Sequence, residues 1–153
     1  MARTVRDVMT PNPICCHPTD SVRHAAQLMA ECHAGALPVV SDQSPQRIEG
    51  IITDRDICCS AVARGGNPDT SRVGEFMTRN VVSCRAEDDL QNCIRAMEQN
   101  QIRRVPVVDE RGVCIGMVAL ADLALKAGEP ATLQQVLKAV SRPSLQASVP
   151  RAA

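Results

Sequence analysis

Aromatic residues are almost absent from this sequence of 153 residues, which contains one Phe (Phe76), no Trp and no Tyr. Proteins that hold single-stranded nucleic acids stack bases on aromatic side chains, so this class of function is disfavoured. No charge of one sign predominates, because 17 basic residues balance 17 acidic ones. We therefore expect no binding of nucleic-acid backbones or anionic membranes through net charge.

Long hydrophobic runs are missing as well. No stretch approaches the roughly 20 apolar residues of a membrane span, and the N-terminal MARTVRDVMT lacks the apolar centre of a signal peptide. We expect a cytoplasmic protein with no membrane partner. The 44% of hydrophobic and 22% of charged residues are typical of a globular chain. Its core must be built from aliphatic, Met and Cys side chains.

Motifs for metal binding and catalysis are not evident. The eight cysteines include no C-x-x-C spacing, which would let two thiolates converge on one metal ion. Reduced, structural thiols are favoured over a metal site, although the adjacent pairs Cys15-Cys16 and Cys58-Cys59 leave a redox sensor open. The three histidines lack a partner in a nucleophile motif, and there is no phosphate-binding Gly-rich loop. We therefore expect no enzyme, no metal site and no obligatory cofactor.

The sequence contains two copies of one pattern. The stretch from Val5 to Val40 aligns with the stretch from Val73 to Val108, and the polar loop that follows is two residues longer in the first copy. Each copy predicts a strand, a helix, two strands and a second helix, a β-α-β-β-α unit. The predicted parts of the chain are repeat 1 over 1–66, a linker over 67–71, repeat 2 over 72–128, and a C-terminal helix with a disordered tail over 129–153.

Two local patterns carry most of the functional information. The first helix of each copy is expected to begin at an acidic cap, Asp20 or Asp88. Between the last strand and last helix, the first copy reads GIITDRD over residues 50–56, and the second reads GMVALAD over 116–122. One interpretation is that the hydroxyl and the carboxylate at this point do no more than cap the following helix. They are also the groups that bind phosphate and sugar hydroxyls.

The order of these elements resembles the cystathionine-β-synthase (CBS) domain family. The motifs ALPVV and RVPVV before the hairpin, GIITDRD after it, and their duplication resemble a stand-alone tandem pair of bacterial or archaeal type. The similarity covers about Val5 to Lys126. It implies an α/β (α+β) fold in which the two repeats pack through their sheets around a pseudo-two-fold axis. It also implies a cleft on each side of that axis and a homodimer that forms a flat disc of four repeats.

The resemblance implies a site for an adenosine-containing ligand in the cleft between the repeats. In CBS domains that bind adenosine nucleotides, the aspartate of Gly-x-x-Thr/Ser-x-x-Asp holds the ribose and the hydroxyl residue meets phosphate. By that analogy Asp56 binds the ribose, Thr53 contacts phosphate, and Arg55 either leans toward phosphate or lies in solvent. The expected ligand-binding residues are Thr53, Arg55 and Asp56, then Gly35, Ala36 and Leu37 beside the adenine, and Arg103 and Arg104 from the other repeat.

Among the two arginines, Arg104 is the stronger candidate for phosphate, although both could be surface charges. A weaker second site is expected at Asp122, because Ala119 replaces the hydroxyl residue of the first motif. One lost charge-assisted hydrogen bond costs about 1.5 to 3 kcal/mol. We therefore predict one good nucleotide site per chain.

These features together predict a regulatory sensor that binds AMP, ADP, ATP or S-adenosylmethionine between its repeats. The adenosine nucleotide would be a regulatory ligand, and the sensor would act on a separate, unidentified effector protein. Two alternatives stay open: a ligand-free structural or stress-response dimer, and a thiol-based redox sensor.

Overall fold

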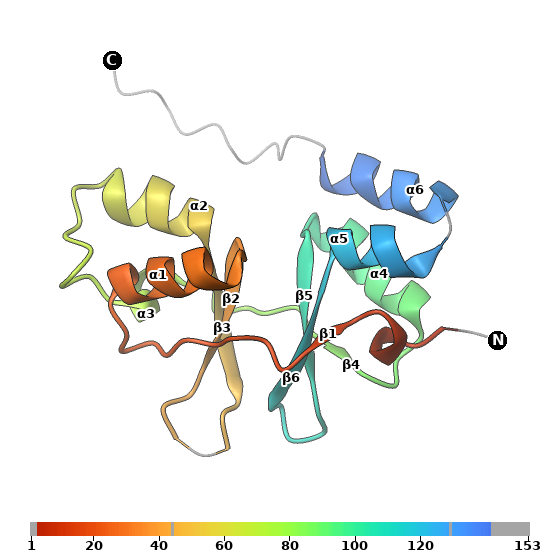
Figure 1. Ribbon diagram of the computed structural model, residues 1–153, viewed down its shortest axis with the longest axis horizontal. Helices are drawn as coiled ribbons and strands as arrows, with labels where there is room; N and C mark the ends of the chain where they lie inside the picture. Colours follow the sequence, from red (N-terminus) through yellow and green to blue (C-terminus); the bar gives the residue numbers. More distant parts are fainter. Residues whose placement is uncertain (1–2, 44, 129, 142–153) are drawn as a thin grey trace.

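The computed structural model describes residues 3–43, 45–128 and 130–141 and shows two α/β halves side by side (Figure 1). The strands of both halves meet at the centre, and the helices lie around them. The predicted α/β fold with two packed repeats is confirmed. In chain order the elements are η1 (Val5–Asp7), β1 (Thr10–Pro11), α1 (Val22–Cys32), β2 (Ala36–Val40), β3 (Ile48–Thr53), α2 (Asp54–Asp56), η2 (Ile57–Val62), α3 (Val73–Phe76), β4 (Cys84–Arg85), α4 (Leu90–Asn100), β5 (Arg104–Val108), β6 (Cys114–Ala119), α5 (Leu120–Asp122), η3 (Leu123–Ala127) and α6 (Pro130–Val140).

Helices α1 and α4 occupy the same place in the two repeats and begin one residue later than the sequence predicts. Ser21 caps α1 by accepting a hydrogen bond from the N–H three residues on (3.1 Å), and Asp89 caps α4 by accepting from the N–H two residues on (2.8 Å). The expected caps, Asp20 and Asp88, were wrong. Each carboxylate instead accepts from the N–H three residues before it (2.8 Å) and closes the turn that precedes the helix.

The two sheets repeat the same hairpin. Strands β2 and β3 pair antiparallel in the first half, as β5 and β6 do in the second, and each pair has a bulge at the corresponding Val-Val step. In the second half, β4 adds parallel to β5, which gives a sheet with the order β1-β6-β5-β4. An antiparallel bridge between Arg47 and Val113 joins the hairpin of one half to that of the other.

The segment that leads into each repeat pairs with the sheet of the other repeat. Strand β1 lies antiparallel to β6, with Thr10 opposite Met117. In the segment that leads into the second repeat, Thr78 likewise forms an antiparallel bridge to Ile51 on β3, with N···O distances of 3.0 and 2.9 Å. Since Thr10 and Thr78 are corresponding residues of the two repeats, the exchange is reciprocal.

The hydrophobic cores follow this exchange. Val5, Val8 and Met9, which precede β1, are buried in the core built mainly by the second repeat. Val73 and Met77, their counterparts before repeat 2, are buried in the core of the first repeat. Each core therefore contains side chains from both copies of the sequence, so the two repeats stabilise each other directly.

The exchange explains why the motif between hairpin and helix begins with glycine in both repeats. A Cβ at Gly50 would lie 2.8 Å from the carbonyl oxygen of Thr78 and 2.9 Å from the sulfur of Met77. A Cβ at Gly116 would lie 2.6 Å from the sulfur of Met9. Only glycine leaves room for the exchanged segment to approach this closely.

We expect Gly50→Ala to lower the free energy of unfolding by about 1 to 3 kcal/mol, because the added methyl group overlaps a backbone oxygen that cannot rotate away. Urea denaturation monitored by circular dichroism measures this change. Gly116→Ala is the matched control and should cost less, since its nearest contact belongs to the flexible side chain of Met9. Equal stability of Gly50→Ala and the unsubstituted chain would contradict the close approach seen in the structure.

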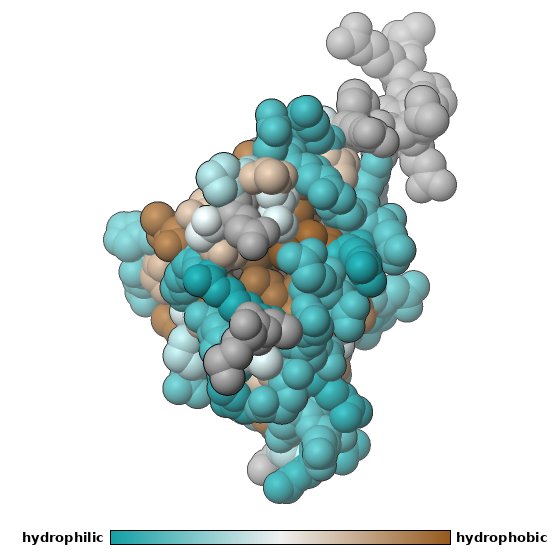
Figure 2. Space-filling view, turned by 90° about the vertical axis from the view of Figure 1, so that its right-hand side faces the viewer, coloured by the Kyte–Doolittle hydropathy of each residue, from teal (hydrophilic) through white to brown (hydrophobic). Residues whose placement is uncertain are grey.

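Helix α6 packs on α4 at the outer side of the second repeat. It lies within the segment for which the sequence predicts a C-terminal helix, and the predicted tail falls on residues 142–153, outside the described part of the chain. Figure 2 looks at this side of the molecule and shows a mainly hydrophilic surface interrupted by hydrophobic areas. None of the helices between residues 3 and 141, within the described ranges, is long and apolar enough to cross a membrane.

Candidate functional site

The GIITDRD motif is where β3 ends and α2 begins. Thr53 is the N-cap of α2, and its Oγ1 accepts a hydrogen bond from the N–H of Asp56 (3.1 Å). In return, Oδ2 of Asp56 accepts from the N–H of Thr53 (2.9 Å). This reciprocal arrangement is a capping box. Both side chains therefore have the capping role that the sequence left open, and their role toward a ligand stays a prediction.

The capping box uses only part of Asp56. Its Oδ1 atom receives no hydrogen bond from any residue that the structure describes, and the residue is half-buried. An ionised carboxylate has acceptor sites on both oxygens. One oxygen can thus hold the backbone while the other remains able to accept hydrogen bonds from a ligand.

Arg104 of the second repeat reaches the first repeat beside this motif. A Cβ added to Gly35 would lie 2.7 Å from Nη2 of Arg104 and 3.1 Å from Oδ2 of Asp54. The guanidinium group therefore lies directly over the Gly35 backbone, next to a carboxylate from the start of α2. The sequence predicted that Arg104 and Gly35 face the same cleft, and the structure brings them together.

Asp54 is the residue at this junction that the sequence analysis missed. It follows Thr53 directly, its N–H donates to the carbonyl of Gly35 (3.0 Å), and its Oδ1 accepts from the N–H of Arg55 (2.8 Å). The available signal was that GIITDRD contains an acidic residue before Asp56.

The other residues predicted for the first site form no polar side-chain contact within the described part of the chain. Arg55 and Arg103 are exposed, and neither side chain forms a hydrogen bond or ion pair within the described residues. Ala36 is buried, and Leu37 packs into the core of the first repeat, so their contribution to a site would come from the backbone. No hydrogen bond or ion pair within those residues joins Arg104 to Asp56.

In the second repeat, both oxygens of the motif aspartate, Asp122, are already hydrogen-bonded within the protein. Oδ2 of Asp122 accepts from the N–H of Ala119 (2.8 Å), as in the first repeat. Oδ1, however, accepts from the hydroxyl of Thr10 (3.1 Å) and from Nζ of Lys126 (3.2 Å). Lys126 also donates to the carbonyl of Val8 (3.0 Å) and so ties the exchanged N-terminal segment to this motif.

This closure gives the two motif aspartates different numbers of free oxygen atoms within the described residues. The Asp122 side chain is 15% exposed and both of its oxygens are used, whereas Asp56 retains a free oxygen. The residue of the first repeat that corresponds to Lys126 is Ser60, which is too short to reach across in the same way. The structure therefore adds a second reason for a weaker site at Asp122, beyond the missing hydroxyl at Ala119.

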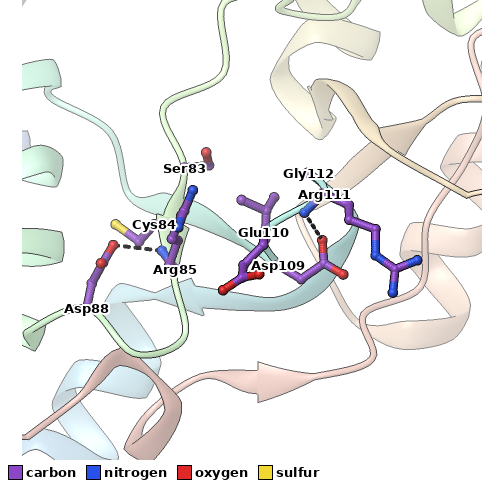
Figure 3. A pocket seen from close by; sticks show the side chains of 9 residues that line it. Ser83, Cys84, Arg85, Asp88, Asp109, Glu110, Arg111 and Gly112 are labelled. Atoms are coloured by element: carbon purple, nitrogen blue, oxygen red, sulfur yellow. Dashed lines mark hydrogen bonds between the residues drawn. The ribbon is translucent and has the colours of Figure 1, made fainter.

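A groove of about 530 Å³ lies elsewhere, at the end of the second sheet (Figure 3). Two of its carboxylates serve their own turns: Asp88 accepts from the N–H of Arg85 (2.8 Å), and Asp109 accepts from the N–H groups of Arg111 (2.8 Å) and Val113 (2.9 Å). The hydrogen bond from the N–H of Val113 is the main cause that holds the pKa of Asp109 below its usual value, and the bond from Arg111 acts in the same direction. Arg85 and Arg111 also line the groove.

The cysteines associate in pairs that the sequence did not reveal. The thiols of Cys15 and Cys114 lie close enough to shift each other's pKa, and so do those of Cys84 and Cys93 in the core of the second repeat. Burial raises the pKa of the Cys16 thiol to about 12. Within the described residues, no group of three or more His, Cys, Asp and Glu side chains is placed to hold a metal ion.

Two α/β repeats that exchange their leading segments, with a charged junction where they meet, define a tandem-repeat protein with a potential ligand site between its halves. The chain belongs to the CBS domain family, whose sequence profile matches residues 5–60 and 73–129. It is 37% identical over 145 residues to Hypoxic response protein 1 of Mycobacterium tuberculosis, which covers 95% of this chain and 99% of the relative. The predicted membership of a stand-alone tandem pair is confirmed.

Two solved structures share the fold along most of the chain. The crystal structure of Hypoxic Response Protein I with two coordinated zinc ions has a TM-score of 0.73 and 36% identity, and the match covers 80% of this chain and 98% of that one. The CBS domain pair of protein MJ0100 in complex with 5'-methylthioadenosine and S-adenosyl-L-methionine has a TM-score of 0.74 and 28% identity, covering 84% and 98%. Both are pairs of the kind predicted.

Proposed function

We propose that this chain is a regulatory sensor that binds one adenosine-containing molecule at the junction of its repeats. The free oxygen of Asp56 accepts the ribose hydroxyls, and Arg104 faces an anionic group of the ligand. The observation that carries this proposal is the position of the Arg104 guanidinium over Gly35, beside the motif that holds Asp56. The adenosine compounds bound by the similar MJ0100 pair support the same ligand class.

A site of this kind can act as a sensor because it takes groups from both repeats. A ligand shifts a conformational equilibrium only by its difference in affinity for the two states. Asp56 and Gly35 belong to the first repeat and Arg104 to the second, so a bound ligand would favour one packing of the repeats over another. That change would be passed to a separate effector protein, and the homodimer expected from the resemblance would offer a larger surface for it.

The charges at the junction also bear on which adenosine compound binds. A phosphate would attract Arg104 but would be repelled by Asp54, whose carboxylate lies at the same point. S-adenosylmethionine carries both a carboxylate for Arg104 and an ammonium group for Asp54. AMP and S-adenosylmethionine are therefore the two ligands that a binding experiment must compare first.

We expect AMP or S-adenosylmethionine, at about one hundred times its dissociation constant, to stabilise the chain by about 2.7 kcal/mol. Arg104→Met should weaken binding of that ligand at least about tenfold, because a charge-assisted hydrogen bond is lost, and should leave adenosine binding unchanged. Thermal-shift measurements with AMP, S-adenosylmethionine and adenosine test both expectations.

Arg103→Met is the matched control, since Arg103 is the exposed residue directly before Arg104 in the chain. It should bind all three compounds as the unsubstituted chain does. Absence of any shift with AMP, ADP, ATP, S-adenosylmethionine and NAD would refute the sensor and favour the ligand-free dimer. An equal loss in Arg103→Met and Arg104→Met would refute the specific role of Arg104.

A further inference from the structure

The exchanged N-terminal segment brings Cys15 next to Cys114, 99 residues further along the chain. Pro11 pairs with Gly116, and the N–H of Asn12 donates to the carbonyl of Ile115 (3.0 Å), so the chain after β1 runs beside the first residues of β6. This antiparallel alignment leads the following residues of the segment toward Cys114.

The side chain of Cys15 turns back toward this strand pair. Its Sγ donates to the carbonyl of Pro13 (3.3 Å), two residues earlier, and Sγ of Cys114 donates to the carbonyl of Gly116 (3.6 Å). The two thiols lie close enough that each shifts the pKa of the other. Both residues are half-buried, so a small solute can reach them.

We propose that Cys15 and Cys114 form a reversible disulfide that fastens the exchanged N-terminal segment to strand β6. Peroxide is the oxidant. The Cys15 thiolate attacks one peroxide oxygen, the O–O bond breaks, and hydroxide leaves to give a sulfenic acid. The Cys114 sulfur then attacks the Cys15 sulfur, and the hydroxyl leaves with the Cys114 proton as water. Two thiols and one hydrogen peroxide thus give one disulfide and two water molecules, and a dithiol reductant reverses the bond.

The local chemistry sets Cys15 as the attacking residue and Cys114 as the resolving one. The neighbouring Cys114 thiol lowers the pKa of the Cys15 thiol against the opposing effect of burial. The proximity of Cys15, followed by burial, raises the pKa of the Cys114 thiol. A thiolate is the nucleophile in thiol oxidation, so Cys15 reacts first.

Other cysteine pairs are less suited to this reaction. Cys16 is fully buried and bridges to β2, so it points away from its neighbour Cys15. Cys84 and Cys93 are also in contact, but both are buried in the core of the second repeat and shielded from a solute. They provide an internal control for accessibility.

The test treats the full reduced chain with a small excess of hydrogen peroxide, blocks free thiols with iodoacetamide, and analyses a non-reducing tryptic digest by mass spectrometry. We expect peptides 7–23 and 112–126 to be joined through Cys15, with Cys16 alkylated. Because the bond closes a long loop, the oxidised chain should melt on the order of 10 °C higher, and dithiothreitol should abolish the increase.

Cys114→Ser should prevent both the cross-link and the increase in melting temperature, and dimedone should then trap a sulfenic acid at Cys15. Cys93→Ser, which removes one thiol of the buried pair, should leave the cross-link intact. Circular dichroism establishes that each variant is folded. The proposal is overturned if the folded chain after peroxide carries alkylated Cys15 and Cys114, or if the bond joins either of them to another cysteine.

Discussion

Asp56→Asn is expected to lower the affinity for the adenosine ligand by at least about a hundredfold. Asparagine keeps one carbonyl oxygen but replaces the second acceptor by an NH₂ group, which donates and cannot accept the ribose hydroxyls. Two hydrogen bonds to a charged group are lost, each worth about 1.5 to 3 kcal/mol. Isothermal titration calorimetry with the ligand selected by the thermal-shift panel measures this loss.

The choice of asparagine separates the ligand role of Asp56 from its role as a cap. The remaining carbonyl oxygen can still accept from the N–H of Thr53, which now donates to Oδ2 of Asp56 at 2.9 Å. We therefore expect the free energy of unfolding to change by less than about 1 kcal/mol. Alanine would remove both roles at once, and its effect on binding could reflect a disordered helix start.

Asp122→Asn is the matched control, because it makes the same change in the closed motif of the second repeat. Binding at the first motif should be unaffected by it. Unchanged affinity in Asp56→Asn, or an equal loss in both variants, would show that the free oxygen of Asp56 does not hold the ligand.

Much of the fold could be predicted because the information was local and duplicated. The helical spacing of apolar residues, the two hairpin patterns and the repeated Pro-Val-Val all appear twice, so each copy supported the interpretation of the other. The exchange of the leading segments could not be predicted in this way. Thr10 pairs with Met117 and Thr78 with Ile51, and nothing in a local pattern states which of two similar sheets a segment will join.

The helix starts show where local signals mislead. Asp20-Ser21 and Asp88-Asp89 each offer two capping residues in succession, and both can accept backbone hydrogen bonds. The first residue of each pair closes the preceding turn and the second caps the helix. A shift of one residue decides between these roles, and it depends on the geometry of the turn.

For the candidate site, the sequence indicated which residue types could bind a ligand but not how far apart these residues lie. It assigned Gly35 and Arg104 to one cleft, with Gly35 beside the adenine and Arg104 toward the phosphate, and it identified the motif that contains Asp56. It missed Asp54, since a carboxylate beside an arginine that is expected to bind phosphate is not part of the expected pattern. It also missed Lys126, which looks like an ordinary surface residue near the end of a helix until the structure places it on Asp122.

Lys126 provides the most direct way to test why the two motifs differ. We expect the double substitution Ala119→Thr and Lys126→Ser to create a second binding event. Threonine at position 119 supplies the hydroxyl that Thr53 has in the first motif, and serine at position 126 copies Ser60. Removal of the ammonium group leaves Oδ1 of Asp122 with one partner, the hydroxyl of Thr10, which can rotate away to admit a ligand.

The new site should bind the nucleoside part of the ligand at least about tenfold more weakly than the first, because Ala36 stands where Arg104 stands in the first motif. Calorimetry in an Asp56→Asn background reports on this site alone, since the first motif is disabled there. Lys126→Arg in the same background is the control and should not bind, because the guanidinium group can still occupy Asp122. A folded triple variant that binds no better than the Lys126→Arg control would show that Lys126 does not close the second motif, and that the asymmetry between the repeats depends on the arginine that the second motif lacks.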